Sequence, residues 1–295
     1  MASDPLAHCI PAFADMDADP VQPFLIRDMA IHPTAQVHPE AKIGRDVEIC
    51  QNAVVGQFVQ IGDGTRIGPN CTILGHTTMG KNNNVVANAV IGTPPQDISY
   101  RGEQTRLVIG DDNTFREFVS VNIGTAKGDG VTTIGSRCLF MACSHVAHDC
   151  IIGDNVIMVN NALLGGHCKV EDRAIINGAA AVTQFTTVGR VSYIGGLTRI
   201  VQDVPPFMIT EGHPAKVRGV NIIGMKRNGF SDEAVNAVKE AHRMIFRSKT
   251  ALNNVFEELE ATYDSIPEIH YLIEFLRNKQ KGKNGRAREA LRKAH

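Results

Sequence analysis

The sequence predicts a mainly β protein: a left-handed parallel β-helix in the form of a triangular prism, followed by a small α-helical C-terminal domain. Aliphatic or aromatic residues recur at every sixth position from Ile31 to Ile200, apart from two interruptions. Of the 26 residues in this series, 12 are followed directly by glycine, which gives the aliphatic-Gly-x-x-small-x unit of hexapeptide repeats. Beyond Gly229 the apolar spacing becomes that of amphipathic helices.

Each hexapeptide supplies one short strand and one tight turn. The repeating apolar residue points inward, and a nearby Gly or Asn tolerates the positive φ that the turn requires. Three hexapeptides close one triangular coil, so residues about 18 positions apart stack in one column, and the coils lie about 4.8 Å apart. Repeats of this kind wind left-handed, although most parallel crossovers are right-handed.

The composition is that of a cytoplasmic globular protein. A hydrophobic content of 43% is ordinary, and a net charge of −1 argues against nucleic-acid binding and against membrane adsorption of the chain as a whole. No apolar run is long enough for an integral membrane segment. Residues 1–30 are rich in Asp and Pro and lack the basic stretch of a secretory signal, so we expect a poorly ordered extension.

Two segments interrupt the six-residue series, near residues 93–107 and 122–133. Both are rich in Gly, Pro and polar residues, and the series resumes after each. We therefore expect a β-helix over residues 31–218 with two loops that project from its corners. Such loops are either tolerated insertions or carriers of binding residues.

The chain changes character after Val201. Val204-Pro205-Pro206 is expected to stop the strands, and residues 219–295 are expected to form the α-helical domain. Three helices are predicted there, over residues 232–248, 251–263 and 268–280. The expected caps are Ser231 for the first helix, Ser248 or Thr250 for the second, and Ser265 followed by Pro267 for the third.

The end of the chain is basic, with Glu289 as the one acidic residue among eight basic ones: Arg277, Lys279, Lys281, Lys283, Arg286, Arg288, Arg292 and Lys293. This pattern is typical either of a solvated helical end or of a docking surface for an acidic partner.

Four of the seven cysteines stand four positions after a residue of the apolar series: Cys71, Cys138, Cys150 and Cys168. That is the small inward position of the repeat, where a compact thiol packs in the core. Because the chain contains no CxxC pair, we do not expect structural zinc.

Three histidines gather in one short region: His145, His148 and His167. The 18-residue period places His148, Gly166 and Gln184 in one column and His167 directly above Asp149. An imidazole beside a carboxylate, facing a notch left by a glycine, suits a general base that activates a hydroxyl group. A lone surface histidine is more often structural, but three histidines around one carboxylate favour a functional site.

Longer segments form a more specific pattern: SHVAHDCIIGDNVIMVNNALLGGH (144–167), TQF (183–185), IGG (194–196), QDVPPFM (202–208) and GVNIIGMKRNGF (219–230). With these segments the chain resembles the cytoplasmic acyl-ACP:UDP-N-acetylglucosamine O-acyltransferases. This family begins lipid A biosynthesis by moving a 3-hydroxyacyl chain from acyl carrier protein (ACP) to the 3-position of UDP-N-acetylglucosamine, without a cofactor. The likeness extends from Ile31 to about Ser248.

The resemblance implies a role for each matching residue. His148 would be the general base, Asp149 the carboxylate that orients it, and Gly166 a backbone donor to the thioester oxyanion. Gly196 would form the floor of the acyl groove, where its missing side chain leaves room for a long chain. The residues implied to bind the substrates are Gln96, Asp97, His145, His167, Gln184, Asn221 and Arg227.

The resemblance further implies a homotrimer with ACP as its protein partner, with substrate sites between subunits, and without a metal ion. Several positions depart from the family pattern: Ser99, Asn122, Ile123, Thr183, Ile223 and Asn228. They concern the nucleotide-sugar and acceptor contacts, so a 3-amino UDP-sugar or another nucleotide sugar stays open as the acceptor. The acyl chain length also stays open.

Three alternatives belong to other classes. A trimeric β-helical metalloenzyme of the carbonic anhydrase type would use His145, His148 and His167 as metal ligands, although the SHVAHD spacing and the helical domain fit it poorly. A non-catalytic β-solenoid scaffold would not depend on His148. An acetyl-CoA-dependent hexapeptide acetyltransferase would use a smaller donor.

Overall fold

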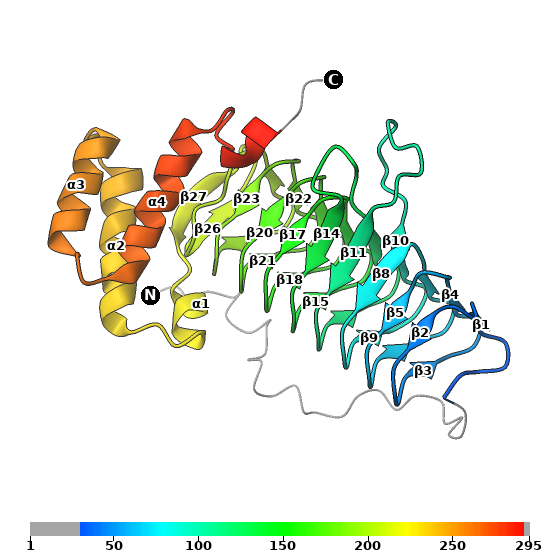
Figure 1. The fold of residues 1–295 in the computed structure, drawn as a ribbon. Coiled ribbons are helices and arrows are strands. Elements are labelled where there is room, and N and C mark those ends of the chain that lie inside the picture. The colour runs from blue at the N-terminus through cyan, green and yellow to red at the C-terminus, as the bar shows by residue number, and fades with distance from the viewer. Residues whose placement is uncertain (1–29, 292–295) are drawn as a thin grey trace.

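The computed structural model describes residues 30–291. They form a prism of short parallel strands with a bundle of helices at one end (Figure 1). Nearly all of the expected N-terminal extension, residues 1–30, lies outside the described residues, and so do residues 292–295.

The strands stack into three sheets that form the sides of the prism. The first sheet contains β1 (Gln36–Val37), β4 (Val54–Val55), β7 (Thr72–Ile73), β10 (Val90–Thr93), β13 (Ser120–Asn122), β16 (His145–Val146), β19 (Leu163–Leu164), β22 (Ala181–Val182) and β25 (Arg199–Ile200). The second contains β2 (Lys42–Ile43), β5 (Gln60–Ile61), β8 (His76–Met79), β11 (Arg106–Ile109), β14 (Val131–Ile134), β17 (Ile151–Ile152), β20 (Lys169–Val170) and β23 (Thr187–Val188).

The third sheet contains β3 (Glu48–Ile49), β6 (Arg66–Ile67), β9 (Asn84–Val85), β12 (Thr114–Phe115), β15 (Leu139–Phe140), β18 (Ile157–Met158), β21 (Ile175–Ile176), β24 (Tyr193–Ile194), β26 (Met208–Glu211) and β27 (Lys216–Val220). Strand β26 follows Pro205-Pro206 and pairs in parallel with β24, and β27 then pairs with β26 antiparallel. The prediction that the two prolines stop the strands was therefore wrong. Val204 forms a parallel bridge with Val188, and β26 follows the two prolines, so the coil continues past them.

The pairing register follows the hexapeptide series. Val37 pairs with Val55, which lies three hexapeptides later. At the interruptions Ile91 pairs with Val121, and Val121 pairs with Val146. The inserted residues therefore lie outside the coils, and the strand pairing continues across them. Figure 1 shows the two loops projecting beyond the coils, between β10 and β11 and between β13 and β14.

The apolar series forms the core of the prism. Its residues are buried from Ile49 to Ile200, and so are the four cysteines at the small position, which confirms their predicted packing. Ile31, at the first coil, is 41% exposed because no described coil lies beneath it.

The corners of the prism carry residues with positive φ, three positions after an inward residue. Asn occupies many of them, as at Asn52 and Asn155, because its short polar side chain tolerates this conformation. Asp149 and His167 occupy the same corner position, with φ of 58° and 61°. The repeat itself therefore presents these two side chains at an edge of the prism.

The helical part contains α1 (Ile222–Arg227), α2 (Asp232–Arg247), α3 (Leu252–Thr262), α4 (Pro267–Lys281) and a 3-10 turn, η2 (Ala287–Leu291). The Ser231 hydroxyl accepts a hydrogen bond from Ala234 N and caps α2 as predicted. Helices α3 and α4 begin after Ala251 and Ile266 without a side-chain cap, so the predicted caps at Ser248, Thr250 and Ser265 were wrong.

Packing replaces those caps. Phe256 and Leu272 are buried in an apolar cluster that also contains Phe207 from the last turns of the prism. The helices therefore rest on the end of the β-helix through a shared core. None of the helices in residues 30–291 combines the length and the apolar character needed to cross a membrane.

Candidate active site

The centre of the site is the Asp149 carboxylate, at the corner after β16. Thr125, in the loop between β13 and β14, donates its backbone N–H to Oδ1 at 2.9 Å and its hydroxyl to Oδ2 at 2.6 Å. The Asp149 N–H donates to the Thr132 hydroxyl at 2.8 Å. Gly128 passes so close to the carboxylate that a Cβ on it would lie 2.3 Å from Oδ1. The loop thus folds over the carboxylate and leaves it 3% exposed.

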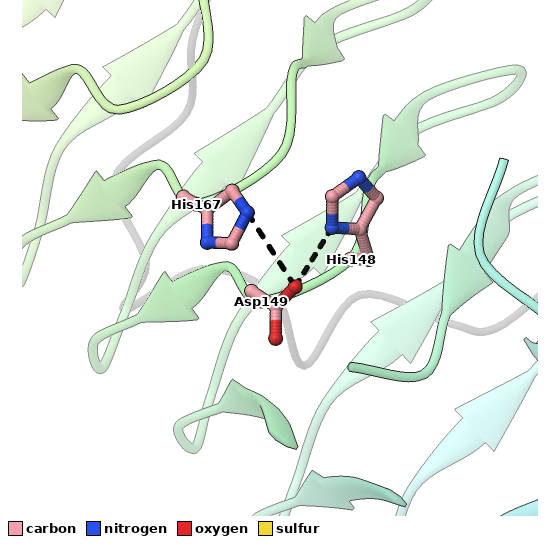
Figure 2. Close-up of side chains that lie close together, drawn as sticks. All are labelled: His148, Asp149 and His167. Carbon is pink, nitrogen blue, oxygen red and sulfur yellow. Dashed lines mark hydrogen bonds and ion pairs between the residues drawn. The ribbon is translucent and has the colours of Figure 1, made fainter. Parts of the chain in front are cut away.

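Two imidazoles flank the same carboxylate oxygen (Figure 2). His148 Nδ1 lies 2.8 Å from Asp149 Oδ2, and His167 Nε2 lies 3.7 Å from it. An ionised carboxylate can only accept a hydrogen bond. His148 Nδ1 is therefore the donor and carries the proton in the neutral ring. Nε2 of His148 is then the nitrogen with a free lone pair, and the side chain is 13% exposed. This arrangement orients one basic nitrogen away from the carboxylate.

Gly166 lies against the His148 ring. A Cβ at Gly166 would lie 2.5 Å from Cε1 and 2.7 Å from Nε2 of His148. The expected open notch is therefore filled by the imidazole itself, and only glycine lets the ring lie this close to the next coil. The Gly166 N–H makes no hydrogen bond within the described part of the chain.

The pKa of the Asp149 carboxyl reflects opposing effects. Burial raises this pKa, but the hydrogen bonds from His148 and Thr125 outweigh burial and hold the pKa below its ordinary value. Asp149 is thus ionised at neutral pH, which is the state that holds the Nδ1–H of His148.

The other two histidines are neutral at neutral pH. Burial, and then the neighbouring His148, lower the pKa of His145, whose Nδ1 lies 2.8 Å from the Ser120 hydroxyl. Burial also lowers the pKa of His167 against the opposing attraction of Asp149. The His167 ring stacks on Phe185 with 4.4 Å between ring centroids.

The loop between β10 and β11 lies near this cluster. Hydrogen bonds from Ser99 hold the pKa of Asp97, which lies in this loop, below its ordinary value, with a smaller contribution from Lys127. Asp97 Oδ1 accepts both the backbone N–H and the hydroxyl of Ser99, at 2.7 and 2.6 Å. Asn122 is buried, and its amide donates to Thr93 Oγ1 and Pro94 O, each at 3.1 Å. Ser99 and Asn122, two departures from the family pattern, therefore shape this loop.

The remaining predicted residues are not joined to the histidines within this chain. Gln96 and Gln184 are exposed side chains. Asn221 caps α1, because its Oδ1 accepts from Gly224 N at 3.0 Å while its Nδ2 donates to Val191 O at 2.8 Å. Arg227 is exposed in the last turn of α1.

Gly196 lies in a column with Gly178. A Cβ at Gly196 would have one neighbour within 4 Å, the Gly178 carbonyl oxygen at 3.3 Å. Space for a larger side chain is therefore present in this chain.

Known proteins resemble both parts of the chain. A family model described as bacterial transferase hexapeptide (six repeats) matches residues 58–93 and 132–166, and one described as Udp N-acetylglucosamine O-acyltransferase, domain 2, matches residues 203–283. The acyl-[acyl-carrier-protein]–UDP-N-acetylglucosamine O-acyltransferase of Anaeromyxobacter sp. (strain Fw109-5) is 48% identical over 254 residues, which is 86% of this chain and 99% of the relative. This chain belongs to that acyltransferase family.

A further relative and two solved structures agree. The acyl-[acyl-carrier-protein]–UDP-N-acetylglucosamine O-acyltransferase of Myxococcus xanthus is 45% identical over 85% of this chain and 98% of the relative. LpxA from Acinetobacter baumannii has a TM-score of 0.80 and 37% identity, covering 83% of this chain and 96% of that one. LpxA of Bacteroides fragilis, a UDP-N-acetylglucosamine acyltransferase, has a TM-score of 0.80 and 38% identity over 84% and 96% of the two chains.

Membership in this acyltransferase family sets aside the metalloenzyme and scaffold alternatives. Among the residues that the structure describes, the group that best resembles a metal site is His148, Asp149 and His167, whose ligand atoms lie within 4.8 Å of one another. His145, which the metalloenzyme alternative also required, does not belong to this group. A metal held by His148 Nδ1 and Asp149 Oδ2 would replace the hydrogen bond between these two atoms.

Sequence reasoning missed several residues of the site. Thr125 and Thr132 lie in or beside an inserted loop, where the six-residue period gives no information about contacts. Phe185 could have been found, because it lies one 18-residue coil after His167. Ser120 could also have been found if the inserted residues before His145 had been subtracted.

Proposed function

We propose that this chain transfers a 3-hydroxyacyl group from ACP to the 3-hydroxyl of UDP-N-acetylglucosamine, the first step of lipid A biosynthesis, with His148 as general base. The observation that carries the mechanism is the 2.8 Å contact between His148 Nδ1 and Asp149 Oδ2. It leaves Nε2 as the nitrogen that takes a proton, and the nearby carboxylate stabilises the imidazolium that results.

In the proposed reaction His148 Nε2 removes the proton of the sugar hydroxyl as its oxygen attacks the thioester carbonyl. The tetrahedral intermediate carries an oxyanion, for which the unpaired Gly166 N–H is the proposed donor. When the intermediate collapses, the carbon–sulfur bond breaks and the imidazolium returns its proton to the thiolate of the carrier. The products are the 3-O-acyl nucleotide sugar and the free thiol of ACP. The thioester is already activated, so the step requires no cofactor.

The same proposal assigns substrate contacts to the residues around this pair. His145 and His167 are neutral and lie beside His148, which suits hydrogen bonding to sugar hydroxyls. Asp97 and Gln96 lie on the neighbouring loop, and Gln184 lies exposed beyond Gly165. Since Asn221 is used as a helix cap, we propose that it acts by positioning α1 and the exposed Arg227.

We propose that the active form is a homotrimer. Arg227 and Gly196 have no described contact with the His148 cluster in their own chain. A threefold assembly of prisms would let α1 and the Gly196 face of one subunit complete the site of a neighbour. The site then lies in a groove between two subunits.

The test is identification of the product. Purified protein is incubated with UDP-N-acetylglucosamine or its 3-amino analogue and with 3-hydroxyacyl-ACPs of several chain lengths, and the products are identified by mass. The proposal expects a 3-O-acyl product. Faster turnover of the 3-amino analogue would assign an amide-forming reaction, and no acylated sugar from either acceptor would refute the proposal.

A further inference from the structure

The chain after α4 folds back onto the last coils of the prism (Figure 1). Asp203 is the residue that holds it there. The Asp203 N–H donates to Gly285 O at 2.8 Å, and Asp203 Oδ2 accepts from Ala287 N at 2.7 Å. Lys279, near the end of α4, donates to the Asp203 carbonyl oxygen at 2.9 Å. Asp203 thus joins three places along the C-terminal segment to the β-helix.

A buried ion pair fixes the turn that follows. Arg286 and Glu289 are 8% and 5% exposed, and Arg286 Nε lies 2.7 Å from Glu289 Oε2. Arg286 Nη1 also donates to Val201 O at 2.7 Å. Neither alternative for the basic end, a solvated helical end or a docking surface, holds for Arg286, since its guanidinium is used inside the fold. The position of η2 is therefore tightly defined.

This turn brings Arg288 to the catalytic cluster. Arg288 Nε donates to the His167 carbonyl oxygen at 3.2 Å, between residues 121 positions apart in the sequence. The positive charge of Arg288 helps to lower the pKa of His167. Its effect is smaller than those of burial, of Asp149, which raises this pKa, and of His148, which lowers it. Arg288 is only partly buried, and its two Nη groups donate to no described residue.

A guanidinium held at Nε with its Nη groups free is suited to an oxyanion ligand, because it offers paired donors in a planar fork. Within residues 30–291, the neighbouring carboxylates do not take that role. Asp129 acts on His167 electrostatically but makes no ion pair with Arg288, and Glu289 is paired with Arg286. The family model of the second domain ends at residue 283, so the match does not cover η2.

We propose that Arg288 is a phosphate-binding residue of the active site, held in place by the Arg286–Glu289 pair and by Asp203. The inference rests on the proposed function, which brings two phosphate-bearing molecules to this edge of the prism. One is the nucleotide sugar with its diphosphate, and the other is the carrier with its phosphopantetheine phosphodiester. Both offer the same chemistry to the guanidinium, and binding experiments separate them.

The experiment compares Arg288→Gln with Lys283→Gln, which removes an exposed charge from the same segment. The glutamine at 288 keeps an N–H donor but loses the charge. Binding of UDP-N-acetylglucosamine alone and of holo-ACP alone is measured by titration calorimetry, with the thermal midpoint of each variant. We expect Arg288→Gln to weaken one of the two ligands about tenfold, the loss of one charge-assisted hydrogen bond, while Lys283→Gln binds both like wild type.

Weaker binding of holo-ACP alone would assign the phosphopantetheine phosphate, and weaker binding of the nucleotide sugar alone would assign the diphosphate. Binding of both ligands within twofold of wild type would overturn the inference, and so would an equal loss in Lys283→Gln. If the wild-type protein bound neither ligand, the proposed function would fail first and the inference with it.

Discussion

Thr125 holds the Asp149 carboxylate at both of its oxygens, through its backbone N–H at 2.9 Å and its hydroxyl at 2.6 Å. An inserted loop therefore orients a carboxylate that belongs to the repeat, and that carboxylate orients His148. Groups of this kind affect turnover without touching the substrate.

Replacing Thr125 tests this chain of orientation. Thr125→Val removes the hydroxyl donor while the backbone bond remains, and we expect kcat to fall roughly tenfold with KM for both substrates little changed. Thr125→Ser should retain most of the activity. Thr105→Val is a matched control, because the Thr105 hydroxyl is buried without a partner in the described structure. Full kcat in Thr125→Val would show that the hydroxyl does not position the carboxylate.

Chain-length preference should depend on Gly196. A Cβ there meets one atom within 4 Å, the Gly178 carbonyl oxygen, so Gly196→Met can extend into the proposed acyl groove. We expect long donors to lose about 0.8 kcal/mol for each methylene that no longer fits, so that shorter donors become the better substrates. The measurement is kcat/KM over a series of 3-hydroxyacyl-ACPs, with Gly196→Ala as the intermediate step. An unchanged preference in Gly196→Met would place the end of the groove elsewhere.

Stability should fall on acidification in a way that depends on His167. Burial lowers the pKa of His167 below 6.5, so His167 binds a proton more readily in the unfolded chain than in the folded one. This contribution to stability is complete above the unfolded pKa and is lost as pH falls from there through the folded pKa. His167→Phe can still stack on Phe185 but does not titrate, and its thermal midpoint should decline less between pH 7 and pH 5. Equal declines in the two proteins would contradict this assignment.

Sharing of the site between subunits predicts complementation. His148→Ala subunits keep Arg227, and Arg227→Ala subunits keep His148, so mixed trimers should regain part of the activity that each variant lacks. The mixture is refolded together and assayed, with formation of mixed trimers checked by mass. If mixed trimers form and remain as inactive as the parents, the two residues act within one subunit.

The repeat made much of this structure predictable. The inward residues, the buried cysteines and the stacking of His167 above Asp149 all follow from one period, because the pairing register of a β-helix is fixed by counting. Counting fails where residues leave the coil. The contacts of Thr125 and Asn122 depend on how the loops fold, and no spacing in the sequence encodes that.

The C-terminal segment shows the second limit. Its charge pattern predicted either a solvated end or a docking surface, yet Arg286 is buried against Glu289 and Val201 O. Tertiary packing buries Arg286, because the fold brings the Val201 carbonyl oxygen and the Glu289 carboxylate to the same guanidinium. The missing caps of α3 and α4 have the same cause, since a shared apolar core stabilises both helices.

The role of His148 is tested most directly by the turnover of 3-hydroxyacyl-ACP and UDP-N-acetylglucosamine in His148→Ala and His148→Asn. Asparagine can still donate a hydrogen bond toward Asp149 but cannot act as a base. We expect kcat to fall by roughly two to four orders of magnitude in both variants, with the thermal midpoint of His148→Asn close to wild type. Turnover within tenfold of wild type in either variant would show that another group removes the proton.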